Sequence, residues 1–93
     1  MSTIPSILYI EDDSRSREVI GSYLEDKGYR VFYASSGEEG LRIYQQEQPQ
    51  LILLDLALTG MDGFQILNRI KGDDSITPVL VISDSGEIKD VIQ

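Results

Sequence analysis

Four short apolar segments recur along the chain at fairly even intervals, and each is typical of a β-strand. They comprise residues 7–10, 31–33, 51–54 and 79–82. The first, third and fourth are apolar without alternation, which is typical of parallel strands that are covered on both faces. The sequence therefore predicts a sheet whose central strands are buried.

A segment with helical periodicity follows the first predicted strand. Val19, Ile20, Tyr23 and Leu24 recur at positions that share one side of a helix, and charged residues occupy other positions around it. Gly28 supplies a stop signal at the C-terminal end of this helix. These four residues are therefore expected to form its buried side.

Three more helices are predicted after the remaining strands. Residues 36–39 fit a capping box at the start of the second helix, and Pro49 ends that helix. The third helix covers about residues 63–71, and a fourth begins near Glu87. The apolar side of the third helix consists of Phe64, Leu67 and Ile70.

The predicted order is a strand followed by a helix, repeated four times. Strands that alternate with helices indicate a parallel sheet with right-handed crossovers, which is an open, doubly wound α/β domain. No internal repeat or linker interrupts residues 1–93, so a single domain is expected. The chain ends only one or two turns into the fourth predicted helix, so this domain is expected to be incomplete at Gln93.

The composition narrows the classes of partner and chemistry. Sixteen acidic residues against eight basic ones give a formal charge of −8, which argues against nucleic acid or an anionic membrane as the partner. Because the chain has no cysteine and no histidine, disulfides, zinc hydrolysis and a Ser-His-Asp mechanism are excluded. The chain lacks a signal-peptide pattern and an apolar run that could span a bilayer, which favours a cytoplasmic location.

Acidic residues follow the predicted strands at the point where each strand ends. Residues 11–13 are Glu-Asp-Asp after the first strand, Asp55 follows the third, and Ser83 and Asp84 follow the fourth. Open parallel sheets bind ligands outside the carboxyl ends of their strands, so these groups are expected to gather at one edge. A cluster of carboxylates is costly unless a cation neutralises it, and an all-oxygen site suits Mg²⁺ where a phosphoryl group joins the coordination.

The acidic residues after the first strand also have a purely structural interpretation, in which Asp13 or Ser14 caps the first helix. Asp55 is harder to explain in this way. It directly follows four apolar residues of the most buried predicted strand, where an unpaired carboxylate is costly. Asp55 therefore indicates a functional site.

Three segments taken together resemble a known family. They are Leu-Tyr-Ile-Glu-Asp-Asp at residues 8–13, Leu-Leu-Asp-Leu-Ala-Leu-Thr-Gly-Met-Asp-Gly at residues 53–63, and Val-Leu-Val-Ile-Ser at residues 79–83. In this order and spacing they resemble the receiver domain of two-component response regulators, over essentially all 93 residues. The resemblance implies a flavodoxin-like (CheY-like) doubly wound sheet with strand order 2-1-3-4, incomplete because the family's fifth strand and fifth helix are missing.

The resemblance also implies roles for five residues. Asp55 is identified as the phosphoacceptor, which takes a phosphoryl group from a phosphohistidine on a histidine kinase or phosphotransfer protein. Glu11, Asp12 and Asp55 would hold Mg²⁺ together with the main-chain carbonyl of Ala57. Ser83 would supply the hydroxyl that moves to the phosphoryl group and so switches the protein's contacts with partners.

The missing fifth strand has two expected consequences. The family has a lysine after that strand, and none of Lys27, Lys71 and Lys89 fits this role because all three lie in or near predicted helices. Residues 79–82 would become an exposed edge strand, which favours a homodimer formed by strand addition.

Two alternatives to a working phosphoacceptor remain open. A degenerate receiver could act only as an interaction or dimerisation module, and the missing lysine and the carboxylate of Asp84 would favour it. A Mg²⁺-dependent phosphohydrolase of the haloacid dehalogenase type also uses an aspartate at a strand end. It needs a second acid two residues further on, where this chain has Ala57, so the sequence argues against it.

Overall fold

The computed structural model describes residues 4–55, 63–73, 76–82 and 88–91. Its strands are β1 (Ser6–Ile10), β2 (Arg30–Ala34), β3 (Leu51–Asp55), β4 (Val79–Ile82) and β5 (Ile88–Val91). Its helices are α1 (Ser14–Asp26), α2 (Gly37–Glu47) and α3 (Gly63–Asp73). The four predicted strands and the first three predicted helices are therefore confirmed to within a few residues. No helix in these described ranges is long and apolar enough to cross a membrane.

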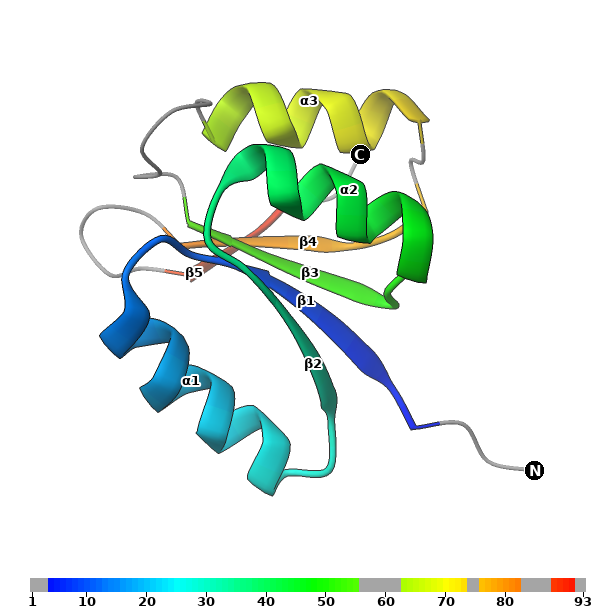
Figure 1. Ribbon diagram of the computed structural model, residues 1–93. Coiled ribbons are helices and arrows are strands. Elements are labelled where there is room, and N and C mark those ends of the chain that lie inside the picture. The colour runs from blue at the N-terminus through cyan, green and yellow to red at the C-terminus, as the bar shows by residue number, and fades with distance from the viewer. Residues whose placement is uncertain (1–3, 56–62, 74–75, 83–87, 92–93) are drawn as a thin grey trace.

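The strands form one twisted sheet in the order β2-β1-β3-β4-β5. The first four strands are mutually parallel, which confirms the predicted order 2-1-3-4. Helix α1 covers one face of the sheet, and α2 and α3 lie side by side on the other face (Figure 1). The described residues thus form three layers, with β1 and β3 at the centre of the sheet.

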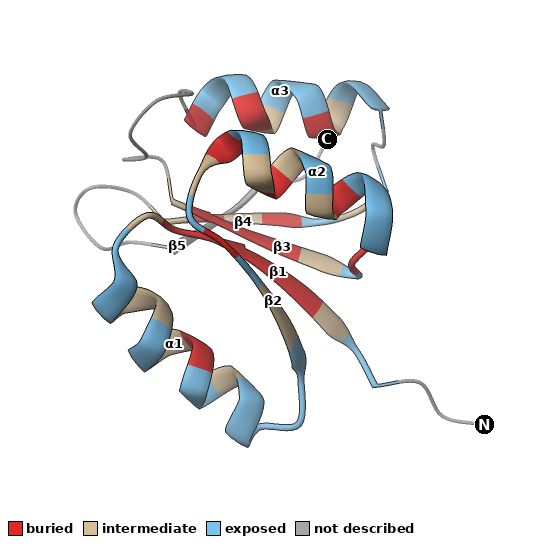
Figure 2. Ribbon diagram, viewed as in Figure 1, coloured by how far each residue is buried: buried red, intermediate tan, exposed pale blue. Residues whose placement is uncertain are grey.

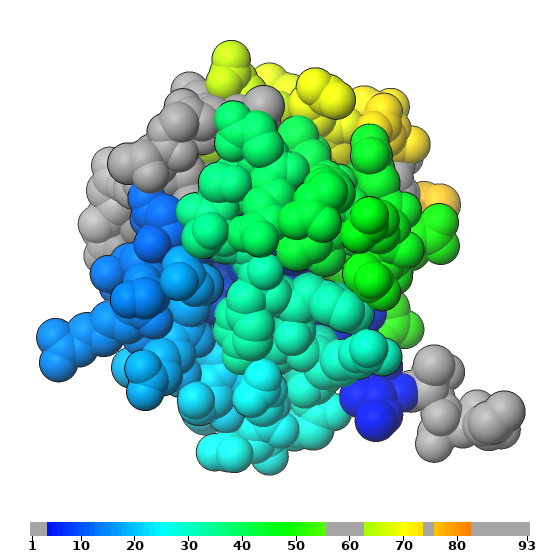
Figure 3. Space-filling view, viewed as in Figure 1, coloured from blue at the N-terminus to red at the C-terminus, as the bar shows by residue number. Residues whose placement is uncertain are grey.

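The alternation of side chains along the strands divides the core between the two faces of the sheet. Ile7 and Tyr9 face α1, whereas Leu8 and Ile10 face α2 and α3. The buried positions lie along the central strands and on the facing sides of the helices (Figure 2). In the space-filling view, little of β1 remains visible behind the elements that cover it (Figure 3).

Helix α1 packs on the sheet through part of the side that the sequence predicts, because Ile20 and Leu24 pack against the core cluster of Ile7, Tyr9 and Leu53. Val19 and Tyr23 are 64% and 59% exposed, and the buried residue of the helix is Gly21. The ring of Tyr33 on β2 lies where a side chain on Gly21 would be, so the absent side chain permits a close approach of helix and strand. In α3, Ile70 is buried as the sequence predicts, whereas Phe64 is exposed and Ile66 is buried instead of it.

The ends of the helices agree with the predicted signals. The side chain of Ser36 accepts a hydrogen bond from the backbone N–H of Glu39 at 3.2 Å, as a capping box requires. The Glu39 carboxylate reaches back one residue further, to the backbone N–H of Ser35 at 2.7 Å. Pro49 follows a left-handed cap at Gln48, and Gly28 follows α1 with a φ of 97°. Both stop signals are therefore confirmed.

The fourth predicted helix is wrong for the residues that the structure describes. Residues 88–91 form β5, which pairs antiparallel with β4, whereas Glu87 lies outside the described residues. A helix of one or two turns forms few hydrogen bonds for the cost of its nucleation, while the open edge of β4 offers a full ladder. Because β4 lies between β3 and β5, the prediction that residues 79–82 form an exposed edge is also wrong. The predicted dimer through that edge loses its basis.

Candidate metal centre

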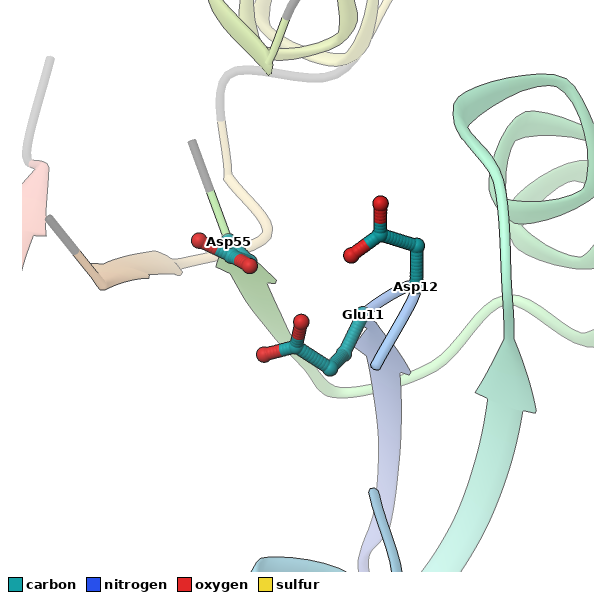
Figure 4. Close-up of side chains that lie close together, drawn as sticks. All are labelled: Glu11, Asp12 and Asp55. Carbon is teal, nitrogen blue, oxygen red and sulfur yellow. The ribbon is translucent and has the colours of Figure 1, made fainter. Parts of the chain in front are cut away.

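Three acidic side chains meet at the carboxyl ends of two neighbouring strands. Glu11 and Asp12 directly follow β1, and Asp55 is the last residue of β3. One carboxylate oxygen from each lies within 4.8 Å of the others. Figure 4 shows the three side chains around a common space between the ends of the two strands. The structure therefore brings together the three side chains that the sequence predicts as metal ligands.

The position of Glu11 is fixed by hydrogen bonds on both its side chain and its main chain. The Tyr9 hydroxyl donates to Oε1 of Glu11 at 3.4 Å, and the backbone N–H of Asp13 donates to Oε2 at 3.2 Å. The guanidinium of Arg17 donates to the main-chain carbonyl of Glu11 at 2.7 Å. The backbone N–H of Glu11 donates to the carbonyl of Ala34 at 2.9 Å, which ties the end of β1 to β2.

The environment of Glu11 stabilises its protonated form. Burial raises the pKa of Glu11 to about 7, helped by a hydrogen bond with Asp55 and by the charges of Asp55 and Asp12, while the Asp13 amide opposes this shift. The side chain is only 6% exposed, whereas Asp12 and Asp55 are partly exposed. Close carboxylates repel one another, and a cation between them would remove this cost. Three carboxylates at this spacing therefore suit a hard divalent ion such as Mg²⁺.

Asp13 does not belong to this cluster. Its carboxylate accepts hydrogen bonds from the backbone N–H of Ser16 at 2.9 Å and from the Ser16 hydroxyl at 2.7 Å. These bonds cap α1 and lower the pKa of Asp13. The structural interpretation is therefore confirmed for Asp13, while the two acids before it face Asp55.

The other predicted site residues fall in parts of the chain that the structure does not describe. Ala57, Ser83 and Asp84 lie outside the described residues. The last described residue before Ser83 is Ile82. Ile82, the last residue of β4, is the direct neighbour of Asp55 on β3.

Two of the lysines have partners at the opposite end of the sheet. The Lys71 ammonium donates to the carbonyl of Thr77, just before β4, at 2.9 Å. The Lys27 ammonium lies 5.3 Å from the ring centre of Tyr23, at the C-terminal end of α1. This agrees with the expectation that neither lysine serves the acidic site, and Lys89 lies in β5 and not in the predicted helix.

Two contacts of the site were missed by sequence reasoning. They are the hydroxyl of Tyr9 and the guanidinium of Arg17, and the sequence analysis assigns neither of them a role at the site. A signal for Tyr9 was present, because residues two apart on a strand share a face and Tyr9 precedes Glu11 by two. No comparable signal exists for Arg17, since its contact with the Glu11 carbonyl depends on the angle at which α1 leaves β1.

The comparisons with known proteins agree with one another. A family model described as the response regulator receiver domain matches residues 7–93. The transcriptional regulatory protein AfsQ1 of Streptomyces coelicolor is 38% identical over 89 residues, which are 96% of this chain and 40% of that protein. The sporulation initiation phosphotransferase F of Bacillus subtilis is 37% identical over 87 residues, 94% of this chain and 69% of that protein.

Solved structures show the same likeness. The chemotaxis response regulator CheY4 of Vibrio cholerae superposes with a TM-score of 0.80 at 27% identity, over 85% of this chain and 68% of that one. The N-terminal domain of a response regulator receiver protein from Methanoculleus marisnigri has a TM-score of 0.79 at 38% identity, over 85% and 66% of the two chains. The chain thus spans about two thirds of these solved chains and less than half of AfsQ1.

Proposed function

Because the chain belongs to the response regulator receiver domain family, we propose that Asp55 is its phosphoacceptor and that Glu11, Asp12 and Asp55 hold Mg²⁺. The observation that carries the proposal is the convergence of these three carboxylates at the ends of β1 and β3. The main-chain carbonyl of Ala57 is proposed as a further ligand, and the Ser83 hydroxyl as the switch. The proposal includes a histidine kinase or phosphotransfer protein as the phosphoryl donor, and a cytoplasmic location.

The three carboxylates differ in how well they suit nucleophilic attack. Glu11 is buried, both of its oxygens accept hydrogen bonds, and its pKa of about 7 leaves it partly protonated near neutral pH. Asp55 is partly exposed at the end of a central strand, where a donor protein can approach it. These contrasts favour Asp55 as the nucleophile and Glu11 as a fixed ligand.

The proposed reaction transfers a phosphoryl group from a histidine nitrogen of the donor to a carboxylate oxygen of Asp55. A carboxylate oxygen of Asp55 attacks the phosphorus, the bond between phosphorus and the histidine nitrogen breaks, and its electron pair returns to the imidazole. The product is an acyl phosphate on Asp55. Mg²⁺ held by Glu11, Asp12 and Asp55 would neutralise the charge on the phosphoryl oxygens. The chain then acts as a signalling domain that phosphorylates only itself.

We also propose that residues 1–93 form a single receiver domain without the family's fifth strand and fifth helix. The parallel order β2-β1-β3-β4 supports this assignment. On the face of the sheet that α1 covers, an apolar cavity of about 250 Å³ lies beside the helix. Its lining includes Ile20, Leu24 and Leu53. This cavity is consistent with a further element packing there in a longer chain.

Labelling by acetyl phosphate tests the phosphoacceptor. The protein is incubated with acetyl phosphate with and without Mg²⁺, and the intact mass is measured for the wild type, Asp55→Asn and Asp13→Asn. We expect a phosphoryl group on the wild type and on Asp13→Asn, but not on Asp55→Asn or without Mg²⁺. Asp13→Asn is a matched control because asparagine also caps a helix and Asp13 lies outside the acidic cluster. Equal labelling of Asp55→Asn and the wild type would refute the proposal.

A further inference from the structure

Tyr9 is a core residue with a polar atom at the edge of the acidic site. Its side chain is fully buried in β1, and its ring belongs to the apolar cluster with Ile7 and Leu53 beneath α1. Its hydroxyl lies where this cluster meets the acidic site, 3.4 Å from Oε1 of Glu11. Tyr9 therefore connects the packed core to one of the three carboxylates.

The hydroxyl of Tyr9 is not needed for packing. A phenylalanine would bury almost the same apolar surface, and a buried hydroxyl without a partner costs free energy. The partner of this hydroxyl is Glu11. Burial and the neighbouring Glu11 carboxylate both raise the pKa of Tyr9, so the hydroxyl keeps its proton and remains a donor.

The two donors to Glu11 come from different directions. Tyr9 donates to Oε1 from within the sheet, and the Asp13 amide donates to Oε2 from the start of α1. Both oxygens of the Glu11 carboxylate are therefore held, and one oxygen from each of Glu11, Asp12 and Asp55 lies within 4.8 Å of the others. A carboxylate that is already oriented loses less conformational freedom on binding a metal, and such outer contacts strengthen metal sites.

We propose that Tyr9 is a positioning residue of the metal centre, whose hydroxyl holds the Glu11 carboxylate in the orientation that binds Mg²⁺. This inference rests on the proposed function, because it requires that the three carboxylates bind the ion. Tyr9 acts through Glu11 and does not contact the ion itself.

Calorimetric titration with MgCl₂ tests the proposal on the wild type, Tyr9→Phe and Tyr33→Phe. Tyr33→Phe is a matched control, because the Tyr33 hydroxyl also donates to a carboxylate, that of Glu25 at 2.9 Å, which lies outside the acidic cluster. We expect Tyr9→Phe to bind Mg²⁺ about threefold to tenfold more weakly, and Tyr33→Phe to bind like the wild type. All titrations are made at a temperature at which thermal melts show each variant to be folded.

Ultraviolet difference spectra separate positioning from packing. Metal binding at Glu11 changes the hydrogen bond that the Tyr9 hydroxyl donates, so MgCl₂ should perturb the tyrosine absorption band of the wild type and of Tyr33→Phe. The perturbation should be absent in Tyr9→Phe. The inference would be overturned if Tyr9→Phe bound Mg²⁺ with the affinity of the wild type, or if MgCl₂ gave Tyr9→Phe the same difference spectrum as the wild type. Either result would leave the metal site intact. Failure of the wild type to bind Mg²⁺ would overturn the metal site and the inference together.

Discussion

Glu11 is a buried carboxyl group between two other carboxylates, and this environment makes the metal-free protein sensitive to pH. Its pKa rises from 4.5 to about 7, first through burial and then through the hydrogen bond and charge of Asp55. The folded protein therefore binds this proton more tightly than the unfolded chain does. The resulting stabilisation is fully present below about pH 4.5 and is lost as the pH rises through about 7.

We expect the free energy of unfolding of the metal-free protein to fall by up to about 3 kcal/mol between these limits, since one pKa unit corresponds to about 1.4 kcal/mol. Urea unfolding in the presence of EDTA at a series of pH values measures this slope. Glu11→Gln should flatten it, whereas the exposed control Glu47→Gln should not. Because Glu11 and Asp55 share a hydrogen bond, the measured transition belongs to the pair.

Mg²⁺ should have the opposite dependence on pH. Its binding requires ionised carboxylates, so MgCl₂ should stabilise the wild type little at pH values well below about 7 and more above it. Thermal melts with and without MgCl₂ across this range test the expectation. A stabilisation by Mg²⁺ that is equal at both ends of the range would show that Glu11 does not titrate in the binding step.

At the scale of elements, the contact between α1 and β2 depends on one glycine. A methyl group on Gly21 would overlap the hydroxyl end of the Tyr33 ring. Tyr33 is exposed on the edge strand β2, and its hydroxyl donates a hydrogen bond to Glu25 at 2.9 Å, which an outward movement of the ring would strain. Glycine has poor helix propensity, but at position 21 it leaves room for the Tyr33 ring of β2.

Substituting this glycine should change stability in a direction that depends on Tyr33. Gly21→Ala should lower the free energy of unfolding by about 1–2 kcal/mol in the wild type, because the lost packing exceeds the gain of up to about 1 kcal/mol in helix propensity. In a Tyr33→Ala background the same change should be stabilising. Gly72→Ala in α3 is the control, since nothing lies within 4 Å of its added methyl group, and it should stabilise both backgrounds. Urea unfolding of these variants measures each effect, and equal effects of Gly21→Ala in both backgrounds would contradict the proposed contact.

The elements that the sequence predicted correctly are those with a strong local signal. The apolar runs of β1, β3 and β4 and the acids that follow β1 and end β3 could be recognised without any tertiary information. The exposure of Val19 and Tyr23 on α1 could not be recognised, because the packing of this helix also depends on the fit between Gly21 and Tyr33, two residues from different elements. The strand β5 could not either, because residues 88–91 have a pattern too short to decide between helix and strand, and the edge of β4 decides it.

At the scale of the whole molecule, the sheet is covered unevenly. Two helices pack on one face, while α1 alone among the described helices packs on the other. The apolar cavity beside α1 lies on this second face. The strand β5 completes the sheet on the side of β4, so the far edges of the described sheet are β2 and β5. Because β5 pairs with β4, the unpaired backbone N–H and C=O groups of the described sheet lie on β2 and β5 and not on β4.

Removing β5 should convert this molecule into one that associates with itself. A chain shortened to residues 1–87 would expose the hydrogen-bonding groups of β4, next to the buried side chains of Val79 and Val81, and an exposed apolar edge strand pairs readily with another chain. We expect this shortened chain to sediment as a dimer or larger species. A chain of residues 1–91, which keeps β5, is the matched control and should sediment like the 93-residue protein. A monomeric 1–87 chain with an intact circular dichroism spectrum would show that β4 does not need β5 to protect its edge.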